Sequence, residues 1–436
     1  MASSIADATR PKEKPSRVRF IVIYFAVALA VITYIDRVAL SLSRKQVAAD
    51  LNLTDIQMGY VFSAFAAAYA LFEIPGGLMG DRMGPRKVLM RIVIWWSAFT
   101  AATGMAWNFS SLIVTQTLFG AGEAGCFPNI TRAFANWLPQ SERVRSQGII
   151  WLSARWGGAF TPILVAFLFQ FLTWRQAFVS FGLLGVIWAV AFYFWFRDNP
   201  RENPAVNRAE LDLLKNNIPA GAHGSIPWKK FGRSKTVWLL CGQYFVLSFP
   251  WYFLITWAPT FIDERFHVDV TKSTILKVLP LLMGGLGSIF SGMISAPLTR
   301  RTGSILITRR ILGCTGFVGA SACLVLATFL RDPFFAVGAV AFSSFCNDLV
   351  MPTAWGTVMD VAGGYAGTLA GTMNMMGNLG GALYGPAAGF VLTYTHHNWD
   401  AVLYMGAGVY LLGFFMWLVL DSVTPIDRDP AVAAAH

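Results

Sequence analysis

Charged residues are scarce in this chain. Only 13% of its 436 residues are Asp, Glu, Lys or Arg, whereas 55% are hydrophobic. A soluble protein of this length carries roughly 25% charged residues. The composition therefore excludes an ordinary soluble enzyme or binding domain and predicts a membrane protein. The 16 Trp and 35 Phe fit that class, because aromatic residues anchor helices at the membrane interface.

Histidine and cysteine are also rare, with five of each. All five histidines fall in expected loops or the tail, so none can carry a proton in mid-membrane: His223, His267, His396, His397 and His436. Most of the cysteines lie inside apolar runs, and their spacing fits neither a disulfide framework nor a zinc site. The chain also has no phosphate loop or nucleophile elbow. We therefore expect no enzymatic activity, no catalytic residues, no cofactor and no metal.

The net charge of +11 could indicate nucleic acid, but its distribution argues otherwise. The basic residues cluster in short segments between apolar runs, as the positive-inside rule describes for cytoplasmic loops. We expect a lipid bilayer as the surroundings and no nucleic-acid partner. The polar first 19 residues precede an apolar run that is too long for a signal-peptide core. An uncleaved first helix is therefore expected.

A membrane-spanning helix needs about 20 apolar residues. Twelve candidate spans begin near residues 20, 55, 88, 110, 147, 174, 236, 273, 304, 334, 366 and 399. The longest polar interruption divides them six and six. The expected segments are a tail 1–19, a six-helix half 20–196, a central loop 197–235, a second six-helix half 236–421 and a tail 422–436. The basic connections share one side with the N-terminus, so we expect both termini in the cytoplasm.

Two short matches indicate an internal repeat. The paired glycines of "ARWGGAFTP" (154–162) and "GNLGGALYGP" (377–386) are 223 positions apart. Pro128 in "GEAGCFP" and Pro352 in "CNDLVMP" are 224 positions apart. The shared offset suggests two parallel six-helix halves, an architecture of transporters that hold substrate near the membrane midplane.

The connection between the second and third spans reads "GGLMGDRMGPRK" (76–87). It resembles the signature loop of the major facilitator superfamily, G-x-L-x-D-R-x-G-R-[RK], with Pro85 as an inserted difference. The resemblance implies an all-α membrane protein with twelve transmembrane helices in two parallel halves. It also implies that Asp81, Arg82 and Arg86 form a conformational latch that does not touch substrate. An ordinary topogenic loop is the alternative.

Four further stretches resemble one branch of that superfamily, the anion:cation symporters. They are "YIDRVALS", "YALFEIPGG", "GAGEAGCFPN" and "GTMNMMGNLGG". This branch includes carriers of hexonates, hexuronates and glucarate, and the vesicular glutamate and sialic acid carriers. The resemblance implies that Arg37 binds the substrate carboxylate and that Asp36 and Glu123 accept protons.

A charge near the bilayer centre costs at least ~2.5–3.5 kcal/mol, so these residues need a function or a partner. The planar guanidinium of Arg37 suits a carboxylate. The structural alternatives are that Asp36 and Arg37 simply neutralise each other, and that Glu123 holds a neighbouring helix.

The chain departs from that branch in the fourth and fifth spans. Gln116 stands seven residues before Glu123, where the resembling carriers usually have a second anion-binding Arg. Arg155 lies inside the fifth span and is our candidate replacement. We expect it to pair with Glu123 or contact substrate, or else to be a structural partner of another acid. Glu73 stands where the resembling carriers often have Gln. We expect it to be a latch residue rather than a proton site.

Other polar or aromatic residues are expected to complete the substrate site. Tyr34 and Tyr69 match positions that line the cavity in the resembling carriers. Asn374 and Asn378 lie four apart on one helix face. Trp355 could stack on a sugar face, or it could pack against protein or lipid.

We therefore expect a monomeric carrier in a bacterial inner membrane. It would import a small organic anion, a sugar acid above all, together with protons, by alternating access. Aromatic or dicarboxylic acids are the alternative substrates: Gln116 disfavours a dianion, whereas Arg155 would favour one. A solute sensor would need a larger cytoplasmic domain. A drug/proton antiporter would show G-x-x-x-G-P-x-x-G-G in the fifth span, which reads "GGAFTPILVAF".

Overall fold

The computed structural model describes residues 13–215, 217, 228–266 and 270–426. These residues form helices and no strand. The expected tails 1–19 and 422–436 and the central loop 197–235 therefore lie partly outside the described residues.

The first half of the chain forms a bundle of long helices. They are α2 (Arg19–Asp50), α3 (Asp55–Met83), α4 (Pro85–Thr103), α5 (Phe109–Glu123), α6 (Cys126–Trp137), α7 (Gln140–Leu168) and α8 (Trp174–Trp195). Capping explains where some of them begin. Thr54 accepts a hydrogen bond from the backbone of Gln57 at the start of α3. Thr173 forms the equivalent capping hydrogen bond at the start of α8. Helices α5 and α6 form one pass that is broken directly after Glu123.

The second half forms a matching bundle. It contains α11 (Lys235–Tyr252), a π-helical turn η2 (Phe253–Trp257), α12 (Ala258–Phe266), α13 (Val270–Thr302), α14 (Ile305–Phe329), α15 (Pro333–Val361), α16 (Ala366–Tyr394) and α17 (Trp399–Val419). The first three elements follow one another without a loop. Short segments lie between the two bundles: η1 (Pro200–Glu202), α9 (Arg208–Leu213) and α10 (Trp228–Arg233). A further short segment, η3 (Gly363–Tyr365), joins α15 to α16.

Eight helices in the described part of the chain are long and apolar enough to cross a membrane. They are α2, α3, α7, α8, α14, α15 and α17, with the Leu276–Thr302 portion of α13. Helices α4 and α16 and the two broken passes do not meet the same criteria of length and hydropathy. The count of twelve spans therefore stays a prediction.

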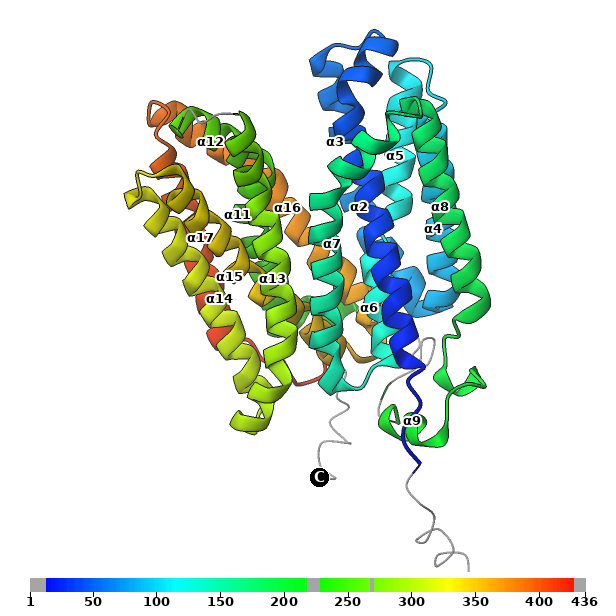
Figure 1. Cartoon of the computed structure of the whole chain (residues 1–436). Helices are drawn as coiled ribbons and strands as arrows, with labels where there is room; N and C mark the ends of the chain where they lie inside the picture. Colours follow the sequence, from blue (N-terminus) through cyan, green and yellow to red (C-terminus); the bar gives the residue numbers. More distant parts are fainter. Residues whose placement is uncertain (1–12, 216, 218–227, 267–269, 427–436) are drawn as a thin grey trace, which may run out of the picture.

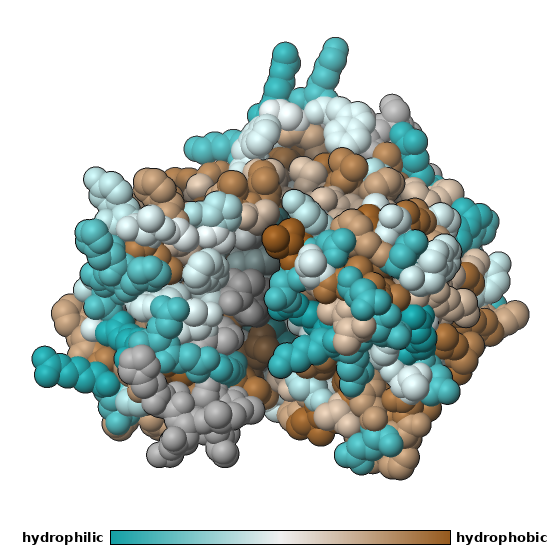
Figure 2. Space-filling view, turned by 90° about the horizontal axis from the view of Figure 1, so that it is seen from above, coloured by the Kyte–Doolittle hydropathy of each residue, from teal (hydrophilic) through white to brown (hydrophobic). Residues whose placement is uncertain are grey.

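The two bundles lie side by side, diverge toward one end and meet at the other (Figure 1). We call the meeting end, where α9 and the first described residues lie, the closed end, and the opposite one the open end. The halves meet mainly through α3 against α16 and α7 against α13. A view from the open end shows a furrow between the halves (Figure 2).

Glycines allow the helices of the two halves to approach closely. A β-carbon on Gly77 of α3 would collide with the carbonyl oxygen of Gly367 in α16, and one on Gly371 would collide with that of Glu73. Small residues at such interfaces let helix backbones come together. Direct backbone packing therefore closes this end.

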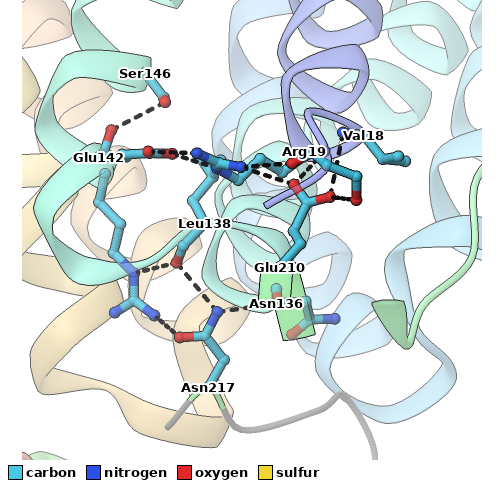
Figure 3. A network of polar contacts seen from close by, with 10 residues as sticks. Val18, Arg19, Asn136, Leu138, Glu142, Ser146, Glu210 and Asn217 are labelled. Carbon is cyan, nitrogen blue, oxygen red and sulfur yellow. Dashed lines mark hydrogen bonds and ion pairs between the residues drawn. The ribbon is translucent and has the colours of Figure 1, made fainter. Parts of the chain in front are cut away.

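Residues of the central loop in and near α9 are bound to the first half at the closed end (Figure 3). Arg19, which begins α2, lies 2.9 Å from Glu142 of α7 and 2.8 Å from Glu210 of α9. Asn217 donates to the carbonyl oxygens of Asn136 and Leu138 at 3.1 Å each. Helix α9 and Asn217 are thus held against the first half.

Candidate functional site

A cavity of about 190 Å³ lies between the two halves. Its wall combines polar groups with many aromatic rings. Six of the eight residues predicted to bind substrate line it: Tyr34, Arg37, Tyr69, Arg155, Asn374 and Asn378.

Arg37 reaches this cavity from α2 and contacts Glu123 with one edge of its guanidinium. Its Nε lies 2.6 Å from Oε1 of Glu123, whose side chain is fully buried, whereas the Arg37 side chain is 25% exposed. The Arg37 Cζ also lies 4.4 Å from the ring centroid of Tyr69, a cation–π contact. Among the described residues, Nη2 of Arg37 has no hydrogen-bond partner. The protein therefore holds the Arg37 guanidinium in place but leaves part of its hydrogen-bonding capacity unused.

Asp36 points away from Arg37, because successive helical residues are about 100° apart. It is buried, and its carboxylate oxygens accept no well-aligned hydrogen bond within the described part of the chain. Glu123 and the indole of Trp96 lie near it. The alternative in which Asp36 and Arg37 neutralise each other is therefore wrong.

Arg155 forms an ion pair across the two halves. Its Nε and Nη2 lie 2.7 and 3.1 Å from the carboxylate oxygens of Asp348, on α15. Both side chains are buried, and the Arg155 Cζ lies 4.0 Å from the ring centroid of Trp251. The expected pairing of Arg155 with Glu123 is wrong, because Glu123 is held by Arg37 and Arg155 faces the second half.

Glu73 joins the halves beside the cavity. Its carboxylate accepts hydrogen bonds from the amide of Asn374 and from that of Asn378, the latter at 3.1 Å to each oxygen. The hydroxyl of Tyr252 donates to Oδ1 of Asn378 at 3.2 Å. The two asparagines thus line the cavity and also hold α16 against α3. This placement agrees with a latch role for Glu73.

Two predicted substrate contacts lie outside the cavity. Gln116 donates to the hydroxyl of Thr103 at 2.9 Å and so faces α4. Trp355 is fully buried and donates to the hydroxyl of Tyr244 at 3.0 Å. It supports a cavity residue, and neither Gln116 nor Trp355 is among those that line the cavity. The structure thus gives no support to a direct substrate contact for either residue, and both contacts stay predictions.

Asp81 of the signature loop forms hydrogen bonds to the opposite half. Its carboxylate accepts hydrogen bonds from the backbone N–H groups of Gly367 and Thr368 at 2.9 and 2.6 Å. Arg82 is exposed and has no ion pair within the described residues. Arg86 donates to the carbonyl oxygen of Tyr193 at 2.9 Å, within its own half. Asp81 thus contacts the second half, whereas Arg86 contacts its own half, and the latch role of the three residues stays a prediction.

Several cavity residues were not predicted, and half of them are aromatic. Trp251 and Tyr252 lie at the end of α11, next to the π-helical turn. Phe127 and Trp151 contribute stacked rings from the first half, with centroids 5.0 Å apart. The stretch "FPWY" (249–252) could have indicated Trp251 and Tyr252 as site residues. A Pro within an apolar run marks an interrupted helix, and interrupted helices form transporter sites.

Two helical bundles with a cavity between them are the architecture of secondary transporters. Residues 26–384 match the sequence profile of the Major Facilitator Superfamily. The chain belongs to this family and is a multi-pass membrane protein.

Curated relatives are similar over almost their entire length. The "Probable sulfoacetate transporter SauU" of Cupriavidus necator is 31% identical, over 91% of this chain and 92% of the relative. The "Hexuronate transporter" of Bacillus subtilis is 29% identical over 95% and 97%, respectively. The "D-galactonate transporter" of Escherichia coli is 29% identical over 93% and 96%.

Solved structures support the fold. The human organic anion transporter MFSD10 superposes with a TM-score of 0.69 at 15% identity, covering 93% of this chain and all of that one. The proton:xylose symporter XylE gives a TM-score of 0.73 at 12% identity, covering 94% and 98%. At these identities the likeness concerns the fold alone.

Proposed function

We propose that this protein is a proton-coupled symporter that imports a small organic anion, a sugar acid above all, across a bacterial inner membrane. The observation that carries the proposal is Arg37, a permanent cation at the cavity with an unsatisfied nitrogen. Relatives named for the transport of sulfoacetate, hexuronate and D-galactonate support an anionic substrate.

The closed end is then cytoplasmic, with both termini, and the structure is the outward-facing state of a monomer. A substrate carboxylate binds Arg37, and protonation of Glu123 frees the guanidinium for it. Asp36, buried beside this pair, takes up a second proton. The halves then rock about the cavity. The proton and the anion favour the same state of the protein. Binding of either one therefore raises the affinity of the protein for the other by an equal factor.

Reconstituted vesicles test this proposal. The purified protein would be placed in liposomes that contain a pH-sensitive dye, and galactonate, glucuronate or galactose would be added outside. We expect internal acidification with the acids and none with the neutral sugar. The Arg37→Gln variant should lose the signal. Arg44→Gln, on the same helix as Arg37 but in an exposed ion pair with Asp55 of α3, should keep it. Acid uptake without proton movement would disprove the coupling, and a response to galactose alone would disprove the anionic substrate.

One observation favours a second substrate class, the aromatic acids. Rings from both halves line the cavity, among them Phe127, Trp151 and Trp251. Aromatic pairs contribute ~0.5–1.5 kcal/mol beyond the burial of their area. Phenylacetate and 4-hydroxybenzoate therefore belong in the same assay, and a preference for them over galactonate would select this class.

A further inference from the structure

We propose that the cavity has two anion positions, one at Arg37 and one at Arg155, and that its preferred substrates are acids with two anionic groups. The inference rests on the proposed function and narrows its substrate class.

Arg155 lines the cavity although its side chain is buried and paired with Asp348. Asp348 engages Nε and Nη2, along one edge of the guanidinium. In the described part of the chain no group is bonded to Nη1, and the residue lines the cavity. Arg37 is arranged in the same way, with Glu123 on Nε. Each arginine therefore has an edge held by a protein carboxylate and N–H groups left for an anion. The guanidinium donors match carboxylate and sulfonate oxygens.

The two cations belong to one rigid part of the protein. Arg37 lies on α2 and Arg155 on α7, and these helices pack against each other within the first half. The second half contributes the neutral amides of Asn374 and Asn378. A substrate with an acidic group at each end would thus be anchored twice on the first half, and its middle would face hydrogen-bonding amides.

The second anion position also has a role in transport. Arg155 and Asp348 lie on opposite halves, so the pair must break when the closed end opens. Breaking a buried ion pair is costly because it leaves two uncompensated charges. A second anionic group on the substrate would replace Asp348 as the partner of Arg155. Asp348 would keep the hydrogen bond from Asn347 within its own half, at 2.8 Å.

Calorimetric binding to the detergent-purified full-length protein tests the inference. Galactonate and galactarate share a six-carbon polyol and differ by one carboxylate. Methanesulfonate and sulfoacetate form a second pair that differs in the same way. We expect the dianion of each pair to bind at least about tenfold more tightly, as expected for one added charge-assisted hydrogen-bonded contact. Equal affinities within both pairs would overturn the inference.

A double variant assigns the effect to Arg155. Arg155→Gln alone would leave Asp348 buried without a counter-charge, so it is combined with Asp348→Asn, which keeps a neutral hydrogen-bonding pair. We expect the preference for galactarate over galactonate, both measured in this variant, to disappear. A preference that survives in this variant, with an unchanged melting temperature, would overturn the inference.

Different binding results would disprove this inference and the proposed function. If galactonate and galactarate bind equally well, the inference fails and the organic-anion carrier stands. If neither acid binds and neutral galactose does, the proposed function fails and the inference fails with it.

Discussion

The carboxylate of Asp81 caps the first turn of a helix in the opposite half. It accepts the backbone N–H of Thr368 at 2.6 Å and the hydroxyl of the same residue at 2.7 Å. Negative charge at a helix N-terminus is favourable, because the backbone N–H groups there lack partners within the helix. An acid at this position therefore stabilises the closed end.

Replacing Asp81 should weaken that end. Asp81→Ala removes charge-assisted hydrogen bonds worth about 1.5–3 kcal/mol. The equilibrium between joined and separated halves at the closed end should therefore shift toward separation by roughly ten- to a hundredfold. Spin labels at the exposed positions Lys87 and Arg301, one on each half, would report longer distances. Arg82→Ala, which changes an exposed neighbour, is the control. An unchanged distance distribution in Asp81→Ala would contradict this role.

Glu73 should tolerate Gln but not Leu. Gln keeps an oxygen that accepts from the asparagine amides, whereas Glu73→Leu leaves the amides of Asn374 and Asn378 without their acceptor. Each unsatisfied buried group costs about 1–3 kcal/mol, so we expect a lower melting temperature and slower transport in Glu73→Leu alone. Abolished proton coupling in Glu73→Gln, with its stability intact, would instead make Glu73 a proton site.

A bulky side chain at Gly371 should prevent closure without unfolding either half. Gly371→Leu would push α16 away from the backbone of Glu73, so vesicle uptake should be lost while expression and monodispersity remain. Gly385 lies on the same helix with open space beside it, and Gly385→Leu is the matched control. Normal uptake by Gly371→Leu would show that the close approach is dispensable.

Glu210 should contribute to stability through the start of α2. Its buried carboxylate accepts hydrogen bonds from Arg19 and from the hydroxyl of Ser16. Glu210→Gln weakens these charge-assisted bonds, and we expect a loss of about 1–3 kcal/mol, seen as a lower melting temperature. Glu202→Gln, at an exposed site of the same loop, should have no effect. Equal melting temperatures in both variants would show that the hydrogen bonds of Glu210 add nothing to the stability of the protein.

The residues of the signature loop and the first span could be predicted because their signals are local. An apolar run of sufficient length determines a span in lipid, and a charged residue within it needs a function or a partner. These local rules led to Arg37, and the resemblance to a signature loop led to Asp81. The resemblance to known carriers added Tyr34 and Tyr69, which do line the cavity.

The partner of each buried charge could not be predicted. Residues 123 and 348 are both acids within apolar segments, and nothing in the sequence says which of them meets Arg155. Gln116 and Trp355 were placed at the cavity, yet they face other helices. A helix that is apolar all round has no polar stripe to show which face turns inward.

The sequence by itself thus determined the membrane environment, the division into two halves and the cation at Arg37, since these depend on composition, run length and local motifs. Only the tertiary structure decided that Arg37 pairs with Glu123 within one half and that Arg155 pairs with Asp348 across both. Those pairings depend on how the helices rotate and pack against one another, and packing between distant segments leaves no local trace in the chain.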